Sequence, residues 1–175
     1  EDQRLRAEID RIIDQRRIER ESNELSWKGF RKFEINRKVQ EGGAICSFYL
    51  TPHDGKPLPP FKPGQYLTFG LDIAGQKRQV IRCYSLSDSP YHPDYYRCSI
   101  KAAPAPRDKP EAPPGLVSNH FHDNLHEGDI IDIKAPGGHF FMDTSKQSPV
   151  VLIGGGIGMT PMLSMLNQII ESGST

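Results

Sequence analysis

The chain has 175 residues, enough for one full domain and part of a second. Its 22 basic residues balance its 22 acidic residues, so no excess of charge points to a nucleic acid or another polyanion as the partner. Its three cysteines are isolated, which excludes a disulfide framework or a paired-cysteine metal site and favours a reducing, cytoplasmic location. We find no signal peptide and no apolar run long enough to span a membrane.

Residues 1–25 are predicted to form a charged, solvent-exposed helix or linker. Leu5, Ile9 and Ile12 recur at helical spacing among many Glu and Arg neighbours. Such a helix could be the tail of an upstream domain, a linker or a dimer contact, and its mixed charges fit a membrane surface less well. The chain begins with Glu1 instead of Met, and we expect a fragment or a processed form of a longer protein.

Residues 26–147 have the pattern of an antiparallel barrel. Short segments rich in β-branched and aromatic residues follow one another, separated by turns that contain Gly, Pro or Asp. We expect strands at 30–36, 44–50, 64–71, 79–87, 95–101 and 130–134. A helix is expected at 119–125, after a proline-rich and mobile loop at 102–114. The predicted fold is therefore mainly β, a closed six-stranded antiparallel Greek-key barrel with one short helix.

A different pattern occupies residues 148–175. The apolar run at 150–153 has the composition of a strand buried on both faces, and a glycine run at 154–158 follows it. Apolar residues then recur at helical spacing, with Thr160 suited to cap the helix and Pro161 suited to its first turn. A strand, a glycine turn and a helix in this order predict the start of an α/β nucleotide-binding domain, which is incomplete here.

The central candidate site lies in the predicted strand 79–87. Arg82 and Tyr84 occupy alternate positions and so share one face, while Ser85 has only its backbone and a short side chain near that face. A guanidinium can clamp a phosphate through two nitrogens, and a phenol can lie along an aromatic ring. The pattern suits a flat, phosphate-bearing ligand, although an ordinary strand with an exposed arginine gives the same residues.

Two further segments are candidate anion sites. Gly115 to Ser118 precede a helix, whose first N–H groups and dipole attract phosphate, and with Arg82 they would favour a pyrophosphate. A plain helix N-cap is the alternative interpretation of this segment. The glycine run at 154–158 is similar to a dinucleotide fingerprint but departs from G-x-G-x-x-G, because Pro161 stands where the last glycine would be.

Five motifs stand in one order along the chain, at 63–66, 82–87, 115–118, 136–140 and 155–161. Together they resemble the ferredoxin–NADP reductase-like flavoproteins, and most closely the FAD-binding reductase portion of flavohaemoglobins, the nitric oxide dioxygenases. The resemblance covers about residues 26 to 171. It implies an NAD(P)H-dependent flavin oxidoreductase of which this chain is a part.

The resemblance also implies roles for individual residues. Arg82 would pair with the flavin phosphates, and Ser85 would hydrogen-bond near N5 of the flavin, with Ser85 and Tyr84 as the catalytic pair. The implied FAD-binding residues are Tyr66, Arg82, Cys83, Tyr84, Ser85, Gly115, Val117 and Ser118, of which Cys83 only holds a strand position. The phosphates of the pyridine nucleotide would be received by Gly155, Gly156, Gly158, Thr160 and Pro161.

Electrons would pass from NAD(P)H through FAD to a haem or iron–sulfur acceptor in another domain or protein. This sequence contains no cysteine cluster for an iron–sulfur centre. A non-catalytic flavin- or nucleotide-binding module that regulates or docks an upstream domain is an alternative. An oligonucleotide-binding barrel is a third, against which the balanced charge counts. His122 and His126 share a helix face, but we interpret them as surface histidines and predict no metal site.

Overall fold

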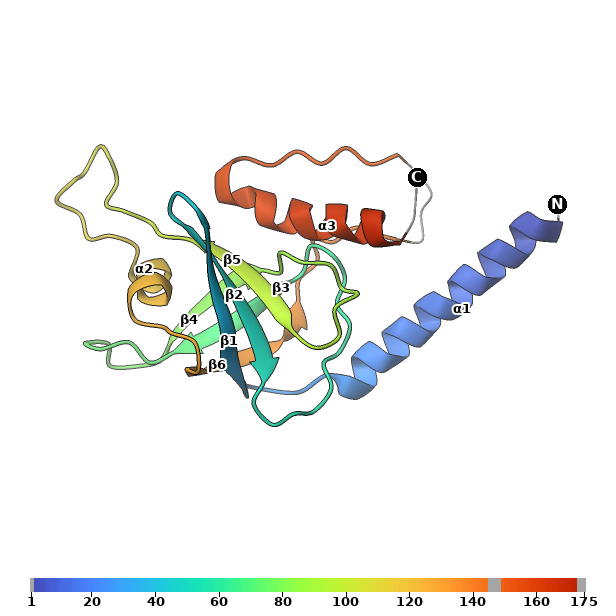
Figure 1. The fold of residues 1–175 in the computed structure, drawn as a ribbon, viewed down its shortest axis with the longest axis horizontal. Helices are drawn as coiled ribbons and strands as arrows, with labels where there is room; N and C mark the ends of the chain where they lie inside the picture. The colour runs from blue at the N-terminus through green and yellow to red at the C-terminus, as the bar shows by residue number, and fades with distance from the viewer. Residues whose placement is uncertain (1, 145–148, 173–175) are drawn as a thin grey trace.

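A computed structural model describes residues 2–144 and 149–172 of the chain (Figure 1). Its elements are α1 Asp2–Leu25, β1 Arg31–Gly42, β2 Ile45–Pro52, β3 Tyr66–Leu71, β4 Val80–Ser85, β5 Tyr96–Lys101, α2 Leu116–Asp123, β6 Ile130–Gly137, the 3₁₀ turn η1 Gly156–Gly158 and α3 Met159–Glu171. The six expected strands are confirmed, with shifted ends. Helix α2 begins at Leu116, earlier than predicted, so the segment 115–118 forms its N-cap and first turn.

The six strands form one antiparallel sheet in the order β4-β3-β6-β1-β2-β5. Strand β6, the last in sequence, lies between β3 and β1, so the connections cross as the predicted barrel topology requires. The edge strands β4 and β5 meet at one isolated bridge, Leu86 with Cys98. The expected closed barrel is therefore a curled, open sheet, because strand β4 ends at Ser85, just before it could continue pairing with β5.

The core lies inside this curled sheet, where alternate strand residues point inward. Phe48 of β2 and Phe69 of β3 have no exposed surface, and Phe121 of α2 packs edge-on against both, with ring centroids at 5.1 Å and 5.2 Å. At the other side of the core, Trp27 Nε1 donates a hydrogen bond to the Ile133 carbonyl at 3.0 Å. Helix α2 thus contributes two buried side chains to the core, Phe121 and Val117.

Helix α1 is confirmed and extends away from the sheet (Figure 1). Its apolar residues Leu5, Ile9 and Ile12 are 57%, 46% and 47% exposed. An ion pair from Lys62 Nζ to Glu19 Oε1 at 3.4 Å links the helix to the loop before β3. Among the described residues, no helix has the length and hydrophobicity needed to cross a membrane.

The predicted buried strand at 150–153 is wrong. Val151 and Ile153 are 82% and 83% exposed, and the segment has no strand structure. A strand of this composition needs neighbouring strands on both sides, and the described chain pairs none with it. The helix that follows is confirmed as α3, with Ser164, Met165 and Gln168 buried. The expected domain boundary between residues 147 and 148 lies outside the described residues.

We expect Phe121→Ala to destabilise the fold by about 3–5 kcal/mol, because it removes a fully buried ring and leaves a cavity between α2 and the sheet. Urea unfolding followed by circular dichroism measures the change. The control is Phe140→Ala, a ring that is 60% exposed, which should change the free energy of unfolding by less than about 0.5 kcal/mol. Equal losses in the two variants would contradict the central place of Phe121 in the core.

Candidate functional site

The candidate site is built on β4, which among the described residues is an edge strand that pairs along its length with β3 only. Arg82 lies opposite Phe69 in this pair, and Tyr84 lies opposite Leu67. Because directly opposed residues share a face, Arg82 and Tyr84 lie on the same face as these two buried core residues. Arg82 is exposed and Tyr84 is partly buried. The shared face that the alternation predicted is confirmed.

Tyr84 connects β4 to helix α2. Its ring centroid is 5.8 Å from that of Phe69 and 5.4 Å from that of Phe121, in edge-to-face geometry with both. Burial raises the pKa of Tyr84 to about 12, and the positive charge of Arg82 acts in the opposite direction. The phenol is therefore neutral at physiological pH and can donate a hydrogen bond. The Arg82 guanidinium donates from Nη1 to the Ile81 carbonyl at 2.8 Å.

Helix α2 begins at Leu116, and its N-cap, Gly115, provides no side-chain hydrogen bond. A Cβ on Gly115 would lie 2.7 Å from Ser118 Oγ and 2.8 Å from Ala103 Cβ, so the close approach of loop and helix requires glycine. Val117 is only 3% exposed and belongs to the core, so only its backbone could contact a ligand. The first turn of α2 therefore offers backbone N–H groups and one hydroxyl to an anion.

The remaining β4 residues face the other side of the sheet. Ser85 lies opposite Tyr66, and Cys83 lies opposite Thr68, with their Sγ and Oγ1 atoms 3.4 Å apart. Tyr66 is 37% exposed, and its ring covers Gly138, where a Cβ would lie 2.8 Å from the ring. The structure thus divides the predicted set between the two faces of the β3–β4 hairpin. A flat ligand at the unpaired edge of β4 could contact both faces.

The glycine run forms an exposed turn before α3. Gly155, Gly156 and Gly158 are all exposed, and Gly156 has φ +54°, a conformation that favours glycine. The N-cap of α3 is Gly158, so the predicted cap at Thr160 is wrong. The 3₁₀ turn starts the helix earlier, and Thr160 Oγ1 instead donates to the Ile157 carbonyl at 3.1 Å. Pro161 falls in the first turn as predicted.

Helix α3 contacts the chain at the open end of the β3–β4 hairpin, just before β3 and just after β4, close to Tyr66 and Ser85. Before β3, Gly64 has φ +108°, and a Cβ there would lie 2.6 Å from Met165 Cε. After β4, Ser164 Oγ donates to the Asp88 carbonyl at 2.7 Å. The structure therefore brings α3 to the Ser85 end of the hairpin.

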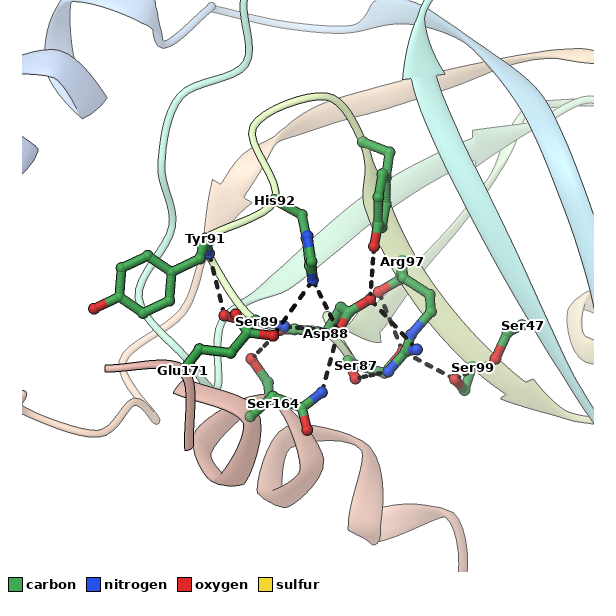
Figure 2. Close-up of polar contacts among 12 residues, drawn as sticks. Ser47, Ser87, Asp88, Ser89, Tyr91, His92, Arg97, Ser99, Ser164 and Glu171 are labelled. Atoms are coloured by element: carbon green, nitrogen blue, oxygen red, sulfur yellow. Dashed lines mark hydrogen bonds and ion pairs between the residues drawn. The ribbon is translucent and has the colours of Figure 1, made fainter. Parts of the chain in front are cut away.

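Sequence reasoning missed the buried polar cluster around Asp88, which is 7% exposed (Figure 2). Its carboxylate accepts hydrogen bonds from the Tyr95 hydroxyl at 3.1 Å and from Asn167 Nδ2 at 3.1 Å, and Arg97 Nη1 lies 3.3 Å from it. Burial and the charge of Asp88 raise the pKa of Tyr95 to about 12. The sequence shows only a turn at Asp88-Ser89-Pro90, and nothing local indicates the partners.

Three hydroxyls extend this cluster into the sheet, those of the buried Ser47 and Ser87 and of the partly buried Ser99. Ser87 Oγ is 2.9 Å from Ser99 Oγ, which is 2.7 Å from Ser47 Oγ (Figure 2). Arg97 Nε donates to Ser87 Oγ at 3.2 Å. Within the described part of the chain, every buried side-chain N or O atom has a hydrogen-bond partner.

The histidines have separate partners. His122 Nε2 is 2.8 Å from the Ile100 carbonyl, whereas His126 Nδ1 lies 3.8 Å from Asp129 Oδ2. Over residues 2–144 and 149–172, the structure contains no group of three or more His, Cys, Asp or Glu side chains placed to hold a metal ion.

Comparison with known proteins gives a consistent picture. A family described as "Oxidoreductase FAD-binding domain" matches residues 32–142. The flavohemoproteins of Halalkalibacterium halodurans and Bacillus subtilis are 44% and 45% identical to the chain over 147 and 145 residues. These matches cover 84% and 83% of this chain but 35% and 33% of the relatives, so the chain spans about a third of their length.

Solved structures agree with this result. The flavohem-like FAD/NAD binding domain of nitric oxide dioxygenase from Vibrio cholerae is 34% identical, with a TM-score of 0.76 over 85% of this chain and 60% of that one. Phthalate dioxygenase reductase is 33% identical, with a TM-score of 0.68 over 83% of this chain and 41% of that one. A flavohemoglobin from Malassezia yamatoensis with bound FAD and heme is 25% identical, with a TM-score of 0.71 over 86% and 37%.

The raised pKa of Tyr84 predicts a loss of stability at alkaline pH. The folded state favours the protonated phenol, so this contribution is complete below about pH 10 and is lost as the pH rises towards about 12. We expect the free energy of unfolding to fall across this window, and to fall less steeply in Tyr84→Phe. Urea unfolding at several pH values from neutral upward measures both slopes. Parallel slopes in the two proteins would exclude a contribution from the Tyr84 hydroxyl.

Proposed function

The chain belongs to the oxidoreductase FAD-binding domain family, and from this membership we propose that it holds FAD in an NAD(P)H-dependent oxidoreductase. One observation carries the proposal. The unpaired edge of β4, with an exposed arginine, lies next to helix α2 through the contact of Tyr84 with Phe121 at 5.4 Å. A cationic side chain and an uncapped helix N-terminus are thus held on adjoining elements, and both bind anions.

The diphosphate of FAD fits these two donors. The Arg82 guanidinium can bind phosphate oxygens through two nitrogens. The first turn of α2 adds backbone N–H groups and the Ser118 hydroxyl, and its dipole contributes about 0.3–1 kcal/mol for a single charge. Ser118 Oγ lies 3.5 Å from the Gly115 carbonyl, at the very start of the helix. Because two donors act together, the site favours a diphosphate over one phosphate.

The ring of FAD fits the other end of β4. Ser85 is three residues beyond Arg82, about 10 Å along an extended strand, and this leaves room for a ribityl chain between them. Tyr84 offers a neutral phenol beside the ring, and the Ser85 hydroxyl can hydrogen-bond a ring nitrogen. FAD, when bound, supplies the redox chemistry, because it accepts two electrons from a reduced pyridine nucleotide and delivers them singly. We propose Ser85 and Tyr84 as the residues that hold the reacting edge of the ring.

We propose three parts for the chain: a helix or linker at 1–25, the FAD-binding unit at 26–147, and the start of a nucleotide-binding domain at 148–175. Two observations support the third part. Val151 and Ile153 are exposed, and so are Leu166 and Ile170 on the outer side of α3, as expected where further strands and helices would pack. In that domain the exposed glycine turn before α3 would approach the nucleotide phosphates.

The proposed acceptor is a haem or an iron–sulfur centre in another domain or protein. The flavohemoglobin from Malassezia yamatoensis contains heme, and phthalate dioxygenase reductase transfers electrons to a [2Fe-2S] centre. Both relatives share the fold of this chain but have different acceptors. The same fold therefore serves with either kind of acceptor. The free thiols of Cys46, Cys83 and Cys98 support a cytoplasmic location.

We expect the purified chain to be yellow and to show flavin absorbance. We also expect little or no oxidation of NADH or NADPH, because residues 148–175 supply only the first turn and helix of a nucleotide-binding domain. Anaerobic stopped-flow mixing with each nucleotide measures flavin reduction, and dithionite serves as the control that the flavin can be reduced. Rapid reduction by either nucleotide would contradict the second expectation. A colourless protein that retards oligonucleotides would contradict the first.

Substitutions at Arg82 test the diphosphate contact. We expect Arg82→Ala to lower the flavin content of the purified protein at least about tenfold, and Arg82→Lys to lower it less, because lysine keeps the charge but loses the bidentate geometry. Flavin absorbance per protein and circular dichroism measure the content and the fold. Arg16→Ala on the exposed helix α1 is the matched control. Unchanged flavin content in Arg82→Ala would reject the role assigned to this residue.

A further inference from the structure

Loop 86–95, between β4 and β5, is where helix α3 meets the sheet, and the Asp88 carboxylate lies at this junction (Figure 2). Its two oxygens face different parts of the chain. Oδ2 accepts a hydrogen bond from Tyr95 at 3.1 Å and pairs with Arg97 at 3.3 Å, both at the β5 side. Oδ1 accepts from Asn167 of α3 at 3.1 Å, and from the Ser89 amide at 2.9 Å. One carboxylate therefore joins the sheet to α3.

The sheet side of this contact continues to the proposed flavin residues. Arg97 donates to both Ser87 Oγ, at 3.2 Å, and the Ser87 carbonyl. The Ser87 amide donates back to the Arg97 carbonyl at 2.8 Å. Ser87 has no exposed surface and lies two residues from Ser85. The short segment that joins Ser85 to Asp88 is thus held to β5 by the hydrogen bonds between Ser87 and Arg97.

The α3 side is fixed as firmly. Ser164 has no exposed surface and donates to the Asp88 backbone carbonyl at 2.7 Å, while Asn167 binds the carboxylate. A second layer lies nearer to solvent, where His92 Nε2 is 3.5 Å from Glu171 Oε1, and the His92 side chain is 38% exposed. Exposed pairs of this kind contribute little, so α3 is held on the loop by the Asp88 contacts and by Gln168, whose Nε2 donates to the Tyr91 hydroxyl at 3.1 Å.

We propose that Asp88 is a positioning residue that couples the flavin-holding strand β4 to the first helix of the nucleotide-binding part. The proposal rests on the proposed function, because it needs FAD to bind at β4. It assigns Asp88 no contact with either cofactor. A ligand that reduces the motion of β4 also reduces the motion of loop 86–95, which follows it. Through its contact with Asn167, the Asp88 carboxylate extends this effect to α3. The orientation of α3 in turn sets the direction from which a nicotinamide reaches the ring at Ser85.

Amide hydrogen exchange on the chain, with and without added FAD, tests the coupling. In the wild type we expect FAD to slow exchange in α3 by at least about fivefold, a typical size for coupling between two sites. In Asp88→Asn we expect FAD still to bind and to slow exchange in β4, but to leave exchange in α3 unchanged. The matched control is Asp94→Asn, an exposed carboxylate in the same loop, which should behave as the wild type.

A second variant keeps the test decisive if Asp88→Asn fails to fold. Asn167→Ala removes the contact from the α3 side and leaves Asp88 paired with Tyr95 and Arg97. We expect it to lose the effect of FAD on α3 as Asp88→Asn does. A response of α3 to FAD that is equal in the wild type and in Asn167→Ala would overturn the coupling. So would a wild type that binds FAD without any change in α3.

Failure of the proposed function has a different signature. A wild-type chain that binds no FAD at all would overturn the proposed function, and the coupling with it. A chain that binds FAD, and whose α3 responds equally in all variants, would leave the proposed function standing and reject Asp88 alone.

Discussion

The structure depends on one short seam, where the two edges of the sheet meet through the bridge between Leu86 and Cys98. Because the sheet joins only there in the part of the chain that the structure describes, the outer edge of β4 from Val80 to Ser85 has no partner strand among those residues. An open edge is normally a liability, since its free N–H and C=O groups invite pairing with another chain. Here the edge is short and carries Arg82, and a bound cofactor would cover it. The feature that leaves the barrel open is thus the feature that makes room for the site.

The same seam contains the Asp88 cluster, and its energetics suggest why the cluster is there. Removing a carboxylate and a guanidinium from water costs several kcal/mol per ion, and pairing Asp88 with Arg97 only offsets that cost. An apolar contact of the same size would stabilise the fold as well or better. An ion pair with fixed hydrogen bonds instead fixes the relative orientation of the elements it joins, because both carboxylate oxygens find partners in few arrangements. Burial of a charge at this position is therefore better explained by orientation than by stability.

The sequence predicted correctly the elements that depend on residues close to one another along the chain. Alternating apolar residues and Gly, Pro or Asp turns give each strand by themselves, and so all six were predicted. The errors arose where the outcome depends on distant partners. The run at 150–153 has a strand composition but no neighbouring strand among the described residues, and Asp88 meets Asn167, which stands 79 positions away. The cap of α3 was misplaced because the glycines upstream continue into a 3₁₀ turn.

The positions of the two helices decide which way a flavin would lie. Helix α2 is attached to β4 through Tyr84, whose ring packs on Phe121 in the last turn of the helix, and the proposed function gives its first turn to the phosphates that Arg82 would bind. Helix α3 contacts Gly64 before β3 and Asp88 after β4, which places it at the opposite end of the hairpin, beside Tyr66 and Ser85. A diphosphate at the first end therefore puts the ring at the second. That is the end at which α3 could bring a nicotinamide, so the place where α3 attaches supports the role proposed for Ser85.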